Sequence, residues 1–415
     1  INAILRTPLA ERTEAQNKSL LTHYTKAIDP IFAKLRKQRD QLLAEQNRLR
    51  KRGSKTLVME EKKGPAIAHI LGRGEYTIRE EKVYANIPEL FRNGNEKAEG
   101  QNRIDLANWL VSTDNPLTAR VTVNRIWYYL LGRGLVETTE DFGIMGARPT
   151  HPELLDYLAV EFMESGWDIQ HIIKLITASA TYQLSDKVES AQREKDPTNL
   201  YLGRSSRFRL EAEQLRDHAL ASSGLLVEKV GGPSVKPYQP EGLWEAVAMN
   251  QSNTRFYKQD QGDHLYRRSL YTFWKRTAAP ASMEILNAPT REFFCVRRDR
   301  TNTPLQAFVT LNDVQFLEAN RHLSAKAIKS GDSFDQRLDF ISLALLGRTF
   351  KSDEREIIRQ SFDRLAKRYK SDPDLAKQLL SNGDSPVDES IAHADHATWM
   401  MVTSQVFNLD ENLTR

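Results

Sequence analysis

The sequence lacks the residues and runs that define several common protein classes. Its 415 residues include one cysteine, Cys295, which excludes an intrachain disulfide, a multi-cysteine metal site and a Cys-x-x-Cys-His haem attachment. No stretch approaches the roughly 18 apolar residues of a membrane-spanning helix. With 59 basic and 55 acidic residues, the net charge of +4 is too small to argue by itself for nucleic-acid binding. The chain also lacks a G-x-G-x-x-G, a P-loop and a G-x-S-x-G motif, which disfavours nucleotide-dependent chemistry and a serine hydrolase.

What remains is the composition of an ordinary globular protein, with 40% hydrophobic and 27% charged residues. The length allows more than one core. The chain begins at Ile1 without an initiator Met or a signal-like apolar segment, and we expect it to be a processed product or part of a longer polypeptide.

Residues 9–52 are predicted to be helical, because aliphatic side chains recur every seven residues at Leu21, Ile28, Leu35, Leu42 and Leu49. Asp29-Pro30 is typical of an N-cap followed by Pro at the first helical position, so we expect two helices meeting at Asp29 or one kinked there. Residues 34–52 carry eight basic residues against Asp40 and Glu45. They form either a solvated face or a surface for an anionic partner.

The rest of the chain is expected to be mainly α-helical with a small β insert. Short β-like runs (TLVM, AIAHIL and EKVYANI) separated by Gly-rich turns predict the insert at 56–91, followed by a polar linker at 92–101. This divides the chain into a helical connector (1–55), the insert and linker (56–101) and a helical domain (102–415). We expect helices at 304–329, 335–347, 353–370 and 387–407, and one more strand at 268–274.

An arginine-rich segment is the first candidate site. Arg297, Arg298 and Arg300 precede Asn302, Thr303 and Gln306, and Thr303-Pro304 fits a helix start. Arginine side chains and the free N–H groups of a helix start both favour an anion, so these six residues could bind an anionic or sugar-like ligand. The alternative is a buried network of caps and ion pairs that joins the last helices to the rest of the protein.

A second charged cluster lies on the predicted helix that begins near residue 209, with Arg209, Glu211, Glu213, Arg216 and Asp217. Paired carboxylates could act as acid and base on a glycosidic bond, whereas the alternative is an ion-paired helix that docks onto the arginines near 297. His151, at a helix start, could serve as a general base or brace the chain. His393-x-x-His396 lacks a flanking third ligand, so we predict no metal site.

Longer segments resemble the DUF1553, or PSD1, domain that is abundant in planctomycetes and related bacteria. The segment from 124 to 185, NRIWYYLLGRGLVETTEDFGIMGARPTHPELLDYLAVEFMESGWDIQHIIKLITASATYQLS, looks like its first hallmark. Later hallmarks follow in the same order, namely RLEAEQLRDHALASSGLL (209–226), GGPSV (231–235), RRSLYTFWKR (267–276), RRDRTNTPLQAFVTLNDVQF (297–316) and FNLDENLTR (407–415).

The resemblance implies an architecture rather than a reaction. Similar domains end larger exported proteins that carry a DUF1549 domain and often a cytochrome c-like domain, which implies an extracytoplasmic location. Haem c would then sit on a preceding or partner domain, with no cofactor in this chain, and residues 9–52 would be the connector that follows DUF1549.

Two functions follow as expectations. The first is a C-terminal module that docks DUF1549 or cytochrome c-like partners and binds an anionic or carbohydrate ligand, such as an anionic polysaccharide, at the arginine-rich segment. The second is an enzyme acting on polysaccharide, hydrolytic or oxidative, with Glu211, Glu213, Asp217 or His151 as acid or base. Nucleic-acid binding through residues 34–52 has the least support, and self-association is left open.

Overall fold

The computed structural model describes residues 1–53, 56–61, 63–64, 67–91 and 102–414. Helices dominate this part of the chain, and its one sheet has two strands, which confirms the mainly α class with a small β element. The predicted linker at 92–101 lies outside the described residues. The chain forms two compact units, Ile1–Leu106 and Ala107–Arg415. No helix in the described ranges is long and apolar enough to cross a membrane.

The first unit begins with a helical segment that contains α1 (Asn2–Leu5), η1 (Leu9–Glu11), α2 (Glu14–His23), η2 (Tyr24–Ile28) and α3 (Pro30–Arg52). The predicted interruption is present: a π-helical turn, η2, separates α2 from α3. The Asp29 carboxylate then caps α3 by accepting from the N–H groups of Ile31 and Phe32, with Pro30 in the first turn. No residue of α3 is buried.

The small sheet pairs β1 (Ile67–Leu71) with β2 (Arg79–Tyr84) in antiparallel register, Ile67 opposite Tyr84. The connection includes η3 (Gly72–Gly74), and η4 (Glu89–Phe91) and α4 (Arg103–Leu110) follow the sheet. The β-like run predicted at 56–59 is not a strand: Leu57 and Val58 are exposed to solvent, and among the described residues only β1 and β2 pair in a sheet.

The second unit starts with three helices that share one core: α5 (Thr118–Leu131), α6 (Pro152–Glu164) and α7 (Ile169–Thr177). Val123, Trp127, Leu158 and Ile172 are among the buried residues of this core. Gly132 ends α5 at a φ of 80°, and a Cβ there would lie 2.4 Å from the ring of Phe208, so this position requires glycine.

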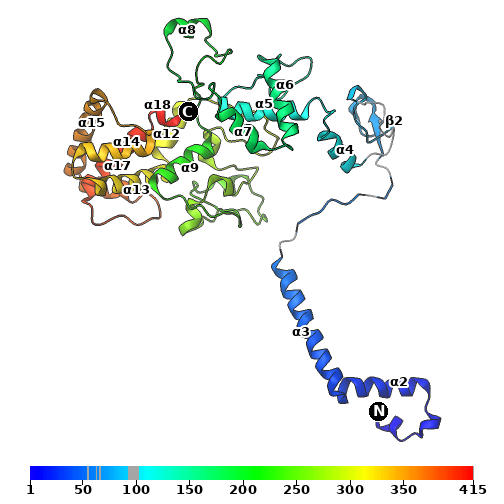
Figure 1. Cartoon of the computed structure of the whole chain (residues 1–415). Helices are drawn as coiled ribbons and strands as arrows, with labels where there is room; N and C mark the ends of the chain where they lie inside the picture. Colours follow the sequence, from blue (N-terminus) through cyan, green and yellow to red (C-terminus); the bar gives the residue numbers. More distant parts are fainter. Residues whose placement is uncertain (54–55, 62, 65–66, 92–101, 415) are drawn as a thin grey trace. The chain divides into compact units, whose positions relative to one another are not determined.

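The larger helical group of this unit consists of α9 (Ala212–Ser223), α12 (Pro304–Asn312), α13 (Val314–Ser330), α14 (Phe334–Leu346), α15 (Ser352–Ser371), α16 (Pro373–Leu380), α17 (His393–Phe407) and α18 (Asp410–Leu413). Helices α13 and α17 lie side by side at its centre, with α9, α14 and α15 around them (Figure 1). Their shared core includes Phe316, Leu323, Ile341, Trp399 and Phe407.

Two helix predictions in this group need correction. The helix expected at 304–329 is broken at Asp313, whose carboxylate accepts from the N–H of Gln315 and starts α13 as a new helix. The helix expected at 387–407 begins only at His393, because the preceding residues form a loop in which Asp388 bonds Lys329 and the N–H of Ser390.

The remaining elements are short: α8 (Ser190–Lys195), α10 (Leu243–Val247), η5 (Gly262–Tyr266), η6 (Ser269–Tyr271) and α11 (Ala281–Ile285). The strand predicted at 268–274 is therefore wrong. Val235 forms an isolated bridge with Thr272, and the N–H of Ser269 donates to the Asp217 carboxylate instead of to a neighbouring strand. The alternation of polar and apolar residues at 268–274 comes from a partly buried loop rather than from a strand.

Candidate functional site

The two charged clusters that the sequence singled out meet in the second unit. Arg298 Nη1 lies 2.5 Å from Glu213 Oε2 and 3.1 Å from Glu211 Oε2. Arg298 Nη2 lies 3.2 Å from the other oxygen of Glu213, so that pair is bidentate. Glu211 is the N-cap of α9, and its backbone N–H donates to Gln214. One arginine therefore ties the segment before α12 to the start of α9.

Burial sets the electrostatics of this cluster. It raises the pKa of Glu211, aided by the like charge of Glu213 and opposed by Arg298 and Arg300. Burial alone would lower the pKa of Arg298, but hydrogen bonding and attraction to the two carboxylates outweigh it and raise that pKa. The three side chains are only 16–20% exposed. Each charge is therefore stabilised mainly by the opposite charge beside it, because little water reaches it.

The space beside these carboxylates is small. The cavity lined by Glu211, Arg298 and Gln306 has a volume of about 10 Å³, which is room for about one water molecule. Glycoside hydrolysis needs two carboxylates held across a sugar ring. This geometry favours a structural role for Glu211 and Glu213 over the acid–base role.

Arg300 joins the same segment to α5. Its Nη1 donates to the carbonyl oxygen of Gly132 at 2.7 Å, and its guanidinium stacks over the rings of Tyr128 and Phe208, 4.7 and 4.3 Å from their centres. The hydroxyl of Tyr128 donates to the carbonyl of Arg298 at 3.3 Å. Arg300 thus clamps two parts of the unit together.

The other predicted ligand residues divide into two groups. Thr303 caps α12 by accepting from the N–H of Gln306, and the Gln306 amide donates to Ile285 and Thr301, so both serve the fold. Arg297 is 46% exposed and lies 3.5 Å from Glu140, and Asn302 is exposed. An anion at this segment would be bound mainly by Arg297 and Asn302. The anion site at residues 297–306 therefore stays a prediction.

The remaining candidates are not gathered around Arg298. Asp217 accepts from the N–H and hydroxyl of Ser269 at 2.8 and 2.7 Å. His151 is the N-cap of α6, and its ring contacts the Thr150 hydroxyl. The Thr150 hydroxyl itself donates to the carbonyl of Leu135 at 3.3 Å.

The two histidines considered for a metal each have an internal partner. His393 contacts Glu389, and the buried ring of His396 contacts the carbonyl of Arg321. Within the described residues there is no group of three or more His, Cys, Asp or Glu side chains that could hold a metal ion.

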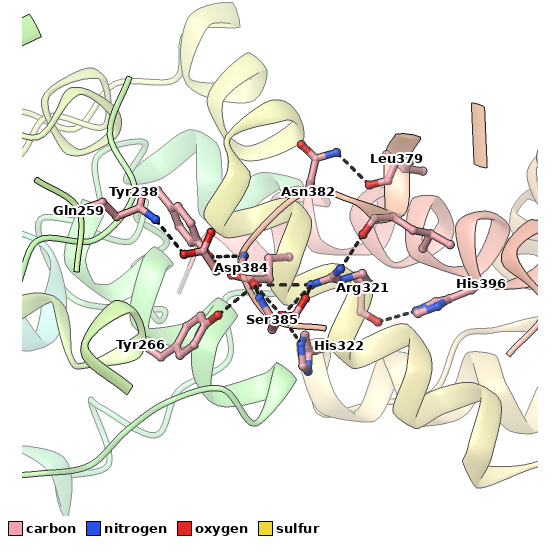
Figure 2. Close-up of polar contacts among 12 residues, drawn as sticks. Tyr238, Gln259, Tyr266, Arg321, His322, Leu379, Asn382, Asp384, Ser385 and His396 are labelled. Atoms are coloured by element: carbon pink, nitrogen blue, oxygen red, sulfur yellow. Dashed lines mark hydrogen bonds and ion pairs between the residues drawn. The ribbon is translucent and has the colours of Figure 1, made fainter. Parts of the chain in front are cut away.

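The sequence interpretation missed a buried ionic network in the second unit (Figure 2). Glu318 and Arg321 on α13 are 1% and 2% exposed. Glu318 accepts from the phenols of Tyr238 and Tyr266 at 2.9 and 3.0 Å, and from the N–H and hydroxyl of Ser385 at 2.8 and 2.6 Å. Burial raises the pKa of both phenols, so they stay protonated and donate.

Arg321 completes this network by donating to backbone carbonyls. Its Nη1 reaches Leu380 at 2.5 Å and its Nη2 reaches Ser385 at 2.7 Å. The ring of His322 lies 2.7 Å from the Ser385 hydroxyl, and burial lowers the pKa of His322. Because that hydroxyl already donates to Glu318 and accepts from Arg321, we interpret this serine–histidine contact as part of a lock on the 381–388 loop.

A third ionic cluster joins the start of α15 to α18. Arg348 donates to both oxygens of Glu354, each at 2.9 Å, and to both oxygens of Glu411 at 2.7 and 2.6 Å. Hydrogen bonding to Arg348 lowers the pKa of Glu354 to about 2 and also lowers the pKa of Glu411. The cluster therefore stabilises the folded state only while its carboxylates are ionised.

This gives a pH prediction for an Arg348→Gln variant. A carboxyl with a depressed folded pKa contributes stability above its ordinary value of 4.5, and that contribution is lost as the pH falls toward 2. We expect the variant to be less stable by roughly 0.5–1 kcal/mol at neutral pH, since the groups are partly exposed. The difference should shrink between these pH values in urea unfolding, and a constant difference would contradict the assigned pairing.

The first unit presents a different kind of surface. Along α3 and the turn before it, Ile28, Ile31, Leu35, Leu42 and Leu49 are between 57% and 71% exposed. Their spacing places them on one stripe of the helix. Only two ion pairs involve this helix in the described structure, Arg39 with Asp40 and Arg48 with Glu45. We call this stripe and its basic flanks the α3 seam.

These features define the class of protein: a mainly helical module, held by buried ion pairs, with an exposed amphipathic helix. Comparison with known families specifies it further. The chain belongs to the DUF1553 family, because residues 102–362 match the model for PSD1, described as a protein of unknown function. Searches among curated proteins and among solved structures found no match.

Proposed function

We propose that this chain is a docking module of an exported, cytochrome c-associated multidomain protein, and that the α3 seam binds the partner domain. The observation that carries the proposal is the exposure of this helix. A 23-residue helix without a buried residue gains little stability from its own propensity in water, since helices in proteins are stabilised mainly by packing an apolar face. A partner that covers the seam would supply that packing.

The width of the seam indicates the shape of the partner. Its aliphatic residues keep a seven-residue spacing, as in the narrow contact between two helices, rather than the broad apolar face of a helix lying on a membrane. Gln38 and Glu45 lie three residues after Leu35 and Leu42, on the same side of the helix as the stripe. Polar residues at such positions favour one register and partner at some cost in affinity.

Charge indicates the chemistry of the partner. Residues 34–52 contain eight basic residues against two acidic ones, namely Lys34, Arg36, Lys37, Arg39, Arg48, Arg50, Lys51 and Arg52 against Asp40 and Glu45. Pairing with a second copy would bring like charges together. An acidic amphipathic helix in a DUF1549 or cytochrome c-like domain fits better, and haem c would then belong to that partner.

The proposal also includes an anionic or carbohydrate ligand for the second unit. The alternative of a polysaccharide-acting enzyme with Glu211, Glu213, Asp217 or His151 has less support. Glu211 and Glu213 are paired with Arg298, Asp217 accepts from Ser269, and the ring of His151 contacts the hydroxyl of its neighbour Thr150. Docking therefore explains more of the geometry than catalysis does.

Isothermal titration calorimetry of the whole chain with the separately produced DUF1549–cytochrome c-like polypeptide tests the docking role. A Leu42→Asn variant should bind roughly 10- to 100-fold more weakly, because a buried leucine contributes about 1.5–3 kcal/mol. Binding should also weaken as salt is added.

The matched control is Leu43→Asn, which makes the same change on the same helix about 100° away from the stripe. It should bind like the unaltered chain. Equal losses in both variants, self-association of the chain through α3, or transfer of binding to anionic vesicles would each contradict the proposal.

A further inference from the structure

Two neighbouring cavities in the second unit form one polar groove. They have volumes of about 380 Å³ and about 720 Å³ and share four lining residues, Asp186, Ser205, Ser206 and Arg207. The smaller cavity lies against the end of α5, and the larger one extends to the start of α15 and to Thr414. The groove is separate from the small cavity beside Glu211 and is large enough for a ligand of several rings.

Positive charge dominates this groove. Its lining contains seven basic residues and three acidic ones, namely Arg133, Lys187, Arg193, Arg204, Arg207, Arg348 and Lys351 with Asp186, Glu354 and Glu411. Arg348 is neutralised by its two glutamates, and Arg133 and Arg207 are paired with Glu137 and Asp410. Arg193 and Arg204 have no carboxylate ion-pair partner among the described residues, and Arg204 instead donates to the carbonyls of Asp196 and Pro197. A cationic centre therefore remains at the smaller cavity.

A donor and an acceptor without partners belong to residues lining the same cavity. Arg133 uses Nη2 for Glu137 at 2.5 Å and Nη1 for the carbonyl of Thr198 at 3.4 Å, which leaves its buried Nε–H without a partner in the described structure. Asn199 uses its amide N–H for Arg204, and its buried Oδ1 also lacks a partner there. Buried polar atoms are normally satisfied, and a hydroxyl group is the ligand chemistry that both accepts and donates.

The loop that carries Asn199 is held in a strained conformation. Asn199 and Leu202 have φ values of 54° and 55°, in the left-handed region that side-chain-bearing residues rarely adopt. The Asp196 carboxylate fixes the loop by accepting from the N–H groups of Leu200 and Tyr201 at 2.8 and 2.9 Å. Such strain, maintained by surrounding bonds, is typical of preorganised binding loops.

We propose that this groove binds an acidic oligosaccharide. A carboxylate or sulfate would lie beside Arg193 and Arg204, and a shift of the Arg133 and Asn199 side chains on binding would expose Arg133 Nε and Asn199 Oδ1 to a sugar hydroxyl. The chain of sugars would continue past Ser205 and Arg207 toward Lys187 and Lys351. This specifies the ligand part of the proposed function at a site other than residues 297–306, and it does not depend on docking through α3.

Calorimetry with the whole chain tests the site with defined probes. Trigalacturonate supplies carboxylates and a chondroitin sulfate hexasaccharide supplies sulfates as well, while maltotriose is neutral and potassium sulfate lacks hydroxyls. We expect one or both acidic saccharides to bind and the other two probes not to bind at the same concentrations. Arg193→Gln, and Arg133→Lys, which keeps the charge but removes Nε, should each weaken binding about tenfold.

The control is Arg364→Gln, which removes an exposed arginine on α15 outside the groove and should leave binding unchanged. Equal binding of maltotriose, equal effects of all three variants, or no binding of either acidic saccharide would overturn the site. These results are independent of Leu42→Asn, so failure of the groove and failure of the docking role are distinguishable.

Discussion

Replacing Glu318 by glutamine should lower the free energy of unfolding of the second unit by about 3–5 kcal/mol, because it leaves Arg321 as an unpaired buried charge. The new amide N–H group would also face donors, since Glu318 accepts from Tyr238, Tyr266 and Ser385. Urea unfolding followed by circular dichroism gives the difference.

A matched control for this substitution is Glu356→Gln on α15, where the glutamate is exposed and contacts Gln360. Its effect should stay within about 0.5 kcal/mol. If Glu318→Gln changed stability no more than this control, the network would not be the lock between α13 and the 381–388 loop that we infer.

The second large effect is expected at Arg298. Arg298→Gln should lower the free energy of unfolding by about 2–3 kcal/mol. This is somewhat less than the loss on breaking a fully buried ion pair, because about a fifth of each side chain is exposed. The loss arises from two neighbouring carboxylates, Glu211 and Glu213, left without their cation. The same urea measurement applies.

Adding Glu213→Gln to Arg298→Gln should recover part of that loss, because it removes the like-charge repulsion. If Arg298 had only a functional role, the free energy of unfolding would hardly change in either variant. Nearly additive losses in the double-mutant cycle would show that these side chains are not energetically coupled.

Local sequence signals predicted the parts of the fold that local chemistry decides. Asp29-Pro30 and Thr303-Pro304 cap helices as expected, since an N-cap depends on atoms within three residues. One of the two interpretations of the second cluster places the helix near 209 against the arginines near 297, and Arg298 does contact Glu211 and Glu213.

The buried network could be anticipated only in part. Glu318 and Arg321 lie three residues apart on a predicted helix, a spacing that favours an ion pair between them. Nothing local indicates that Ser385, Tyr238 and Tyr266 complete it, because these contacts join residues separated by 52 to 80 positions. The groove was missed for the same reason: Arg133 and Asn199 are far apart in the sequence and line the same cavity only after the chain folds.

Hydrogen–deuterium exchange of α3 is the most direct measurement of the docking role. In the isolated chain, the amides of residues 30–52 should exchange quickly, because no residue of the helix is buried. Bound to the DUF1549–cytochrome c-like polypeptide, they should exchange at least roughly tenfold more slowly, since opening the helix then also costs the packing of its apolar seam. Equal exchange of α3 in the free chain and in the complex would contradict the docking role.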